Sequence, residues 1–261
     1  MRILNSSLAL VICLAMIMSA SVFAQGLYWE STTTGEGATQ ISKMFYMPKM
    51  FKIVTNQAEY VLLRLDREMF YTVHPGEKTY SEMSFADMEK TMKGAGARMD
   101  KAMEQMREQM KDMPEEQRKQ VEQMMGGMMK GKEKGTKAPV EVIKTSERKT
   151  VSGRGCTKYI LRRGDEVIAT LWVTKEVKEF EAMSKDFAEF SRRMMAMNPA
   201  TTDAAEGWDK IDGFPMETEH SKGIKTVVTK IEKQSVPVSD FEVPKGYKKV
   251  KSKMAELEEE E

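Results

Sequence analysis

Residues suited to catalysis are scarce in this sequence. The chain has two histidines, His74 beside a predicted turn and His220 at the end of a predicted strand. It has no Gly-x-Ser-x-Gly elbow, no His-Glu-x-x-His motif and no phosphate-cradling glycine loop. Gly94 and Gly96 lie inside a helical pattern and do not follow a strand, so they do not indicate a nucleotide site. We therefore expect no enzymatic activity and no cofactor.

Methionine is the residue whose number and spacing could carry chemistry of another kind. The chain holds 25 Met, and 22 of them follow residue 24, against seven Leu in the same span. A run of methionines comprises Met88, Met92, Met99, Met103, Met106, Met110 and Met113, and the steps from Met99 onward are four, three, four and three. This spacing places the side chains along one face of a helix, the methionine face.

Three interpretations of this methionine face stay open. It can be a core face that packs on the rest of the protein. It can be an adaptable surface for an acyl chain or an apolar partner, because unbranched thioethers repack around irregular guests. It can also be a Cu(I) site in which Met99, Met103 and Met106 converge, because soft thioethers bind that ion. The copper interpretation has no His or Cys nearby to support it, and no other metal site is predicted.

The N-terminal residues predict a secreted protein. Arg2 precedes an apolar run from Leu8 to Ala20, and small residues stand before Gln25, as in a cleaved signal peptide. A run of this length is shorter than the ~20 residues that span a bilayer. Cys13 follows a bulky Ile rather than the small residue of a lipid-attachment box, so lipidation is not expected. We expect a soluble periplasmic protein in which residues 1–24 are removed.

Composition excludes two classes of protein. Lys and Arg number 41 against 40 Asp and Glu, and mean hydropathy is -0.50. Such a chain is too polar for an integral membrane bundle, and it lacks the cationic excess of a nucleic-acid binder. After cleavage Cys156 is the one remaining cysteine, so no internal disulfide can form, and we interpret it as a small buried hydrophobe.

The elements that must position these residues follow from local patterns. Roughly ten strands are predicted in two antiparallel meanders, both of whose faces are apolar. The predicted strands are 27–34, 49–55, 59–66, 69–74 and 78–83, then 140–151, 157–163, 166–174, 214–220 and 223–235, with a closing segment through Phe241. A helix over 176–197 is expected to lie against the sheet.

A Met-rich helical insertion over 84–135 separates the two meanders. Ser84 and Asp87 form a capping-box pattern at its start, Pro114 divides it into two helical arms, and glycines end the second arm. We predict a hairpin on flexible joints that acts as a mobile lid. The organisation is thus a signal peptide 1–24, one domain over 25–250 and an acidic disordered tail over 251–261.

Several short motifs together resemble a known family of secreted bacterial proteins, DUF4412. The motifs are His74-Pro75-Gly76-Glu77-Lys78-Thr79-Tyr80, residues 151–159, Leu171-Trp172-Val173-Thr174, Gly213-Phe214-Pro215-Met216 and Phe241-Glu242-Val243-Pro244-Lys245-Gly246-Tyr247. They span most of residues 26–250, and none is catalytic. That family is similar in fold to the periplasmic lipoprotein carriers LolA and LolB. The resemblance implies a strongly curved, incompletely closed half-barrel sheet wrapped around helices, with a cavity that takes acyl chains in the carriers.

We therefore expect an α+β protein that binds an amphiphile. Ten residues are candidates to line the cavity: Phe51, Val61, Leu63, Tyr71, Leu171, Trp172, Met99, Met103, Met106 and Met110. The six strand residues among them are also expected to be buried. The expected function is a carrier or sensor of a lipid or acylated molecule, acting as a monomer with transient envelope contacts and without nucleic acid. The alternatives are a copper-binding protein and a non-enzymatic interaction module of the envelope.

Overall fold

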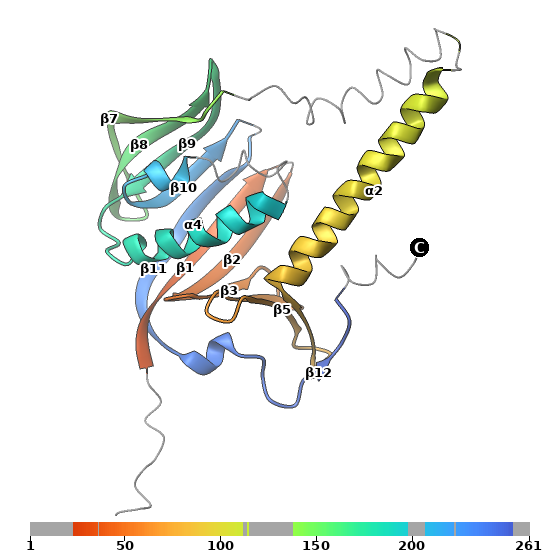
Figure 1. The fold of residues 1–261 in the computed structure, drawn as a ribbon. Helices are drawn as coiled ribbons and strands as arrows, with labels where there is room; N and C mark the ends of the chain where they lie inside the picture. The colour runs from red at the N-terminus through yellow and green to blue at the C-terminus, as the bar shows by residue number, and fades with distance from the viewer. Residues whose placement is uncertain are drawn as a thin grey trace, which may run out of the picture.

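A computed structural model describes residues 23–35, 37–111, 114, 138–197, 207–221 and 223–252 of the chain. These residues form one large sheet with two helices (Figure 1). The strands are β1 (Phe23–Gly35), β2 (Ala38–Met47), β3 (Met50–Val54), β4 (Tyr60–Arg64), β5 (Met69–His74), β6 (Thr79–Ser84), β7 (Glu141–Val151), β8 (Arg154–Arg163), β9 (Glu166–Thr174), β10 (Phe214–His220), β11 (Lys225–Pro237) and β12 (Lys248–Lys249). The helices are α2 (Phe85–Lys111) and α4 (Phe180–Met197), with short 3-10 turns η2 (Trp208–Lys210) and η3 (Val238–Phe241).

The sheet is curved and open. Its 12 strands run in the order β12-β6-β5-β4-β3-β2-β1-β11-β10-β9-β8-β7, so β12 and β7 are its two edges. Every neighbouring pair is antiparallel except β12 with β6. Pairing of β1 with β11 joins the two predicted meanders into one sheet. The predicted α+β class with a curved, incompletely closed antiparallel sheet is confirmed.

β2 is the main element that the sequence prediction missed. Its first half, from Ala38 to Gln40, is exposed, and its polar residues gave little apolar alternation. Its second half ends in Tyr46 and Met47, both buried. Here tertiary pairing between β1 and β3, more than local pattern, determines the strand. The count is twelve strands, not ten, because β12 was also not predicted.

Each of the two helices begins within a few residues of its predicted start. Ser84 caps α2, since its hydroxyl donates to the Asp87 carboxylate at 2.6 Å and accepts the Asp87 backbone N–H at 3.0 Å. This confirms the predicted capping pattern. α4 begins at Phe180 rather than at Glu176. The second arm of the predicted hairpin, after Pro114, lies outside the described residues.

The predicted termini fall largely outside the described residues. Residues 1–22 of the predicted signal peptide and 253–261 of the predicted tail are not described. β1 begins at Phe23, and Ala24 pairs with Val236, so the strand starts two residues before the predicted cleavage point. No described helix is both long and apolar enough to cross a membrane.

The segment after β11 packs against the first meander and is hydrogen-bonded to it. Phe241 of η3 is fully buried, and Arg64 of β4 is only 3% exposed. The Arg64 guanidinium donates to Asp66 at 2.6 Å, to Glu242 at 2.5 Å and to the Phe241 carbonyl at 3.2 Å. These hydrogen bonds raise the pKa of Arg64 and lower the pKa of Asp66. The buried cation is therefore fully paired, as a buried charge must be.

Candidate functional site

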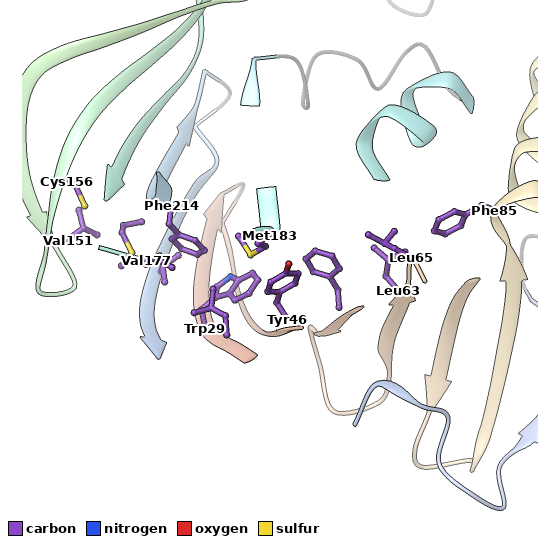
Figure 2. Close-up of a cluster of buried hydrophobic side chains, with 14 of the residues drawn as sticks. Trp29, Tyr46, Leu63, Leu65, Phe85, Val151, Cys156, Val177, Met183 and Phe214 are labelled. Atoms are coloured by element: carbon purple, nitrogen blue, oxygen red, sulfur yellow. The ribbon is translucent and has the colours of Figure 1, made fainter. Parts of the chain in front are cut away.

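The floor of the candidate site is one continuous apolar cluster between the sheet and the helices. We call it the main apolar cluster. Its buried members are Leu27, Trp29, Tyr46, Phe51, Leu63, Leu65, Phe85, Met88, Val151, Cys156, Val177, Met183, Phe214, Met216 and Val228. Figure 2 shows most of them, in a row from Val151 and Cys156 to Phe85 at the start of α2. Removal of these side chains from water is the largest favourable contribution to the fold.

α4 is held on the sheet by a polar contact beside this cluster. The Tyr46 hydroxyl donates to the Asp186 carboxylate at 2.9 Å, and the Lys49 backbone N–H donates to the same carboxylate at 2.7 Å. The Lys49 ammonium lies 2.5 Å from Glu189 and 3.3 Å from Asp186. Burial and the Asp186 hydrogen bond raise the pKa of Tyr46. The middle of α4 is thus fixed by directional bonds as well as by packing.

The turn that receives α4 has an unusual backbone. Pro48 and Lys49 join β2 to β3, and Lys49 has a φ of 65°. Pro followed by a residue of positive φ is typical of a type II turn, whose second position normally takes Gly. A side chain there costs about 1–2 kcal/mol. The backbone N–H and the ammonium of Lys49 both bond to α4 and hold the turn against that helix.

α2 joins the main apolar cluster at its root only. The rings of Phe85 and Phe190 of α4 lie 6.0 Å apart, Met88 is buried, and Met92 packs against the cluster. Further along the helix Met99 is 60% exposed and Met106 is 43% exposed. Figure 1 shows this half of α2 extending beyond the sheet. Burial along this helix face is therefore uneven: Met88 is buried at the root, Met99 and Met106 are exposed, and Met110 is buried again.

A pocket of 510 Å³ opens beside the root of α2. It lies between strand β6, the first turns of α2 and the segment that follows β12. The pocket is lined by Glu82, Met83, Asp87, Lys90, Thr91, Lys249, Val250, Lys251 and Ser252. Its lining combines cationic and apolar side chains next to the main apolar cluster, on which Met83 packs.

A second charged group lies at the other end of the sheet. The Glu217 side chain is 9% exposed and accepts the Lys149 ammonium at 2.8 Å and the Lys225 ammonium at 2.9 Å. The Lys149 ammonium also stands 4.3 Å from the centre of the Trp172 ring. Burial alone would raise the pKa of Glu217, but the hydrogen bonds from the two lysines outweigh it and lower the pKa below 4.5.

This depressed pKa predicts a pH-dependent stability. A carboxylate with a lowered folded-state pKa stabilises the fold above pH 4.5, and the contribution is lost as the pH falls through the folded-state value. Glu217→Gln is expected to lower the free energy of unfolding by about 2 kcal/mol at pH 7, because charged hydrogen bonds are lost. The difference between parent and variant should be smaller at pH 3 than at pH 7. Denaturant unfolding at both pH values measures it, and a difference that does not change with pH would contradict the assignment.

The predicted site residues do not all meet at one place. Phe51 and Leu63 are buried in the main apolar cluster, and Trp172 packs against it, whereas Val61 is half-buried. Tyr71 is also half-buried and pairs with Leu62, so it lies on the sheet face opposite to Leu63.

Leu171 belongs to a different cluster. Adjacent residues of a strand point to opposite faces, so Leu171 and Trp172 cannot share a site. Leu171 is fully buried in a second apolar cluster under η2, formed by Val140, Tyr159, Leu161, Ala169, Leu171, Val173 and Ile211. Its burial was predicted, but its place is in the packing between β7, β8, β9 and the segment around η2.

The methionine face is divided between burial and exposure. Met110 is buried, Met103 is half-buried, and Met99 and Met106 are exposed. A core face alone does not account for the two exposed side chains. Among the described residues no group of three or more His, Cys, Asp or Glu could hold a metal ion. Burial is the main reason that the pKa of the Cys156 thiol is raised. This agrees with the interpretation of Cys156 as a buried hydrophobe.

Several polar residues of the site carried no sequence signal. Asp186, Lys49 and Glu217 each have a partner at least 68 residues away in sequence, and nothing local marks a charged residue as buried. Lys90 and Lys249 meet at the pocket only because β12 pairs with β6. The sole local hint was the basic character of residues 245–251.

Comparison with known proteins identifies a family but no activity. A family model described as "Domain of unknown function (DUF4412)" matches residues 86–247, more than half of the chain. No curated protein matches the chain. Two solved structures of PNGF-II, in space groups C2 and P21, are each 9% identical, with TM-scores of 0.37 and 0.39. The alignments cover 88% and 90% of this chain but 31% and 33% of those chains, so the chain spans about a third of their length.

Proposed function

This chain belongs to the DUF4412 family, and we propose that it binds an amphiphile, a lipid or an acylated molecule, between the sheet and helices α2 and α4. In this proposal the curved sheet is a half-barrel of the kind found in periplasmic lipoprotein carriers, and the helices lie on its inner face. The protein acts as a monomeric, non-enzymatic carrier or sensor in the periplasm.

One observation supports this function above the others. The methionine face of α2 starts inside the main apolar cluster at Met88, which is 5% exposed, and reaches Met99, which is 60% exposed. An apolar surface that is continuous from core to solvent offers an acyl chain a route inward. Exposed apolar surface of this kind is typical of binding sites.

The two helices are suited to different roles. α4 is fixed to the β2–β3 turn through Asp186, so it serves as a rigid wall. α2 contains Gly94 and Gly96, and a methyl group added at either would meet no atom within 4 Å. Because no packing requires these glycines and each weakens a helix by about 1 kcal/mol, they favour a helix that can bend. We infer that α2 is the movable lid.

Methionine at the lid is chemically suited to a variable guest. Its unbranched side chain adopts many shapes at low cost, whereas Leu fixes one shape. Replacement of Met99, Met103, Met106 and Met110 together by Leu keeps the apolar area nearly constant. The variant is expected to be as stable as the parent or more so, and to bind a fluorescent fatty acid but a narrower range of chain lengths.

The same variant distinguishes the copper alternative. Met99, Met103 and Met106 supply the thioethers that a Cu(I) site would need, and Leu supplies none. Parent and variant should be titrated with Cu(I) and with the fluorescent fatty acid. Tight Cu(I) binding by the parent that is abolished in the variant, without fatty-acid binding by either protein, would show that the methionine face is a metal site.

A further inference from the structure

The pocket beside the root of α2 has the composition of a receptor for a negatively charged group. Three lysines line it, Lys90, Lys249 and Lys251, against two carboxylates, Glu82 and Asp87. The volume of 510 Å³ is large enough for a small polar headgroup. The pocket is also bordered by the first turns of a 27-residue helix, whose dipole favours a negative charge there.

The two carboxylates are already engaged. Glu82 accepts the Lys249 ammonium at 2.7 Å, and this hydrogen bond raises the pKa of Lys249. Asp87 accepts the Ser84 hydroxyl at 2.6 Å as part of the helix cap. Lys90 makes no ion pair with another residue in the part of the chain that the structure describes. The Ser84 hydroxyl is neutral, so Asp87 keeps its charge, and the three lysines and two carboxylates of the lining leave one positive charge in excess.

The pocket also adjoins apolar surface on its inner side. Met83 lines it and at the same time packs against the main apolar cluster. Val250 lines it as well and is 41% exposed. Met88 precedes Lys90 by two residues, about 200° around the helix, so the methionine face lies on the other side of α2 from the pocket. Met83 is therefore the contact between the charged pocket and the main apolar cluster, and together they match the two ends of one amphiphile.

We propose that this pocket binds the anionic headgroup of the amphiphile, a carboxylate or a phosphate, with Lys90 as its main contact. The acyl chain then passes Met83 toward the main apolar cluster. This inference rests on the proposed function, since it names the chemical class of the ligand. It predicts that an anionic amphiphile binds more tightly than a neutral one with the same chain.

The test compares three lauroyl probes on the full chain. Laurate carries a carboxylate, lauroyl lysophosphatidic acid carries a phosphate, and monolaurin is neutral. Lys90→Gln is expected to weaken binding of the two anionic probes about tenfold, the loss of one charged hydrogen bond. Binding of monolaurin should not change. The anionic probe whose affinity falls more in Lys90→Gln identifies the headgroup as a carboxylate or a phosphate.

Two further variants control for charge and folding. Lys185→Gln removes one positive charge from α4, where Lys185 is 73% exposed and pairs with Glu181 outside the pocket, so it should change no affinity. Lys90→Arg keeps the charge and should restore binding of the anionic probes. Melting temperatures of all variants should equal that of the parent, because Lys90 is exposed.

The outcomes separate the headgroup assignment from the proposed function. If the parent binds monolaurin as tightly as the anionic probes and Lys90→Gln changes nothing, the headgroup assignment is wrong while amphiphile binding stands. An equal loss for all three probes would also overturn the assignment. If the parent binds none of the three probes, the proposed function itself fails. Competition of inorganic phosphate against laurate, lost in Lys90→Gln, would support the pocket as the charged site.

Discussion

Leu63→Asp is expected to destabilise the protein by at least about 4 kcal/mol, because it combines a lost apolar side chain with a buried, unpaired carboxylate. Leu63 is 4% exposed, pairs with Phe51 and Phe70 across the sheet, and belongs to the main apolar cluster. The free energy of unfolding of a domain is only about 5–15 kcal/mol, so a loss of this size can unfold a large part of the protein.

Denaturant unfolding of two companion variants isolates the cause. The free energy of unfolding of Leu63→Ala should fall by about 2–5 kcal/mol, because the substitution leaves a cavity and no buried charge. Ile41→Asp, at a strand residue that is 58% exposed, should change the free energy of unfolding by no more than about 0.5 kcal/mol. An unchanged melting temperature for Leu63→Asp would mean that β4 does not face the main apolar cluster in this register.

Gly213→Ala is the second change with a large expected effect. Gly213 has a φ of 138°, a backbone conformation that a side chain rarely adopts. A methyl group there would run into the Thr174 carbonyl oxygen and would lie 2.9 Å from the Val173 side chain. Because the obstacle is backbone of the neighbouring strand β9, it cannot move aside. We expect the free energy of unfolding of Gly213→Ala to be lower than that of the parent by about 3 kcal/mol or more.

The position explains the size of the effect. Gly213 stands between Ile211 of the second apolar cluster and Phe214 of the main apolar cluster, so a displaced backbone disturbs both. Gly153→Ala is the matched control, since Gly153 also has a positive φ of 79° but no neighbouring atom within 4 Å. The free energy of unfolding of Gly153→Ala should fall only by the conformational cost of about 1–2 kcal/mol. Equal losses in thermal unfolding would show that the close approach does not matter.

Local sequence patterns were sufficient for most of the sheet. β5, β9 and β10 begin and end where alternation and turn residues predicted, because runs such as Met69–His74 are rich in strand-forming residues and end at Pro75-Gly76. β2 was missed because much of it is exposed and polar, and β12 because two lysines form a strand only through pairing with β6. Their positions depend on partners distant in sequence.

The candidate site could be predicted only in its apolar part. Burial of Phe51, Leu63 and Leu171 followed from alternation, but which cluster each joins depends on strand register and bulges, as the separation of Leu171 from Trp172 shows. The methionine face was visible as a helical period, whereas the division between buried Met88 and exposed Met99 depends on where α2 leaves the sheet. Polar anchors such as Asp186 needed the structure.

The central claim is that an amphiphile binds between the sheet and the two helices. Its most direct test is equilibrium titration of the parent protein with a fluorescent fatty acid, followed by displacement with unlabelled fatty acid. The account predicts saturable binding of one molecule per chain that unlabelled fatty acid reverses. Absence of saturable binding to the folded protein, confirmed as folded by its cooperative unfolding, would contradict the account.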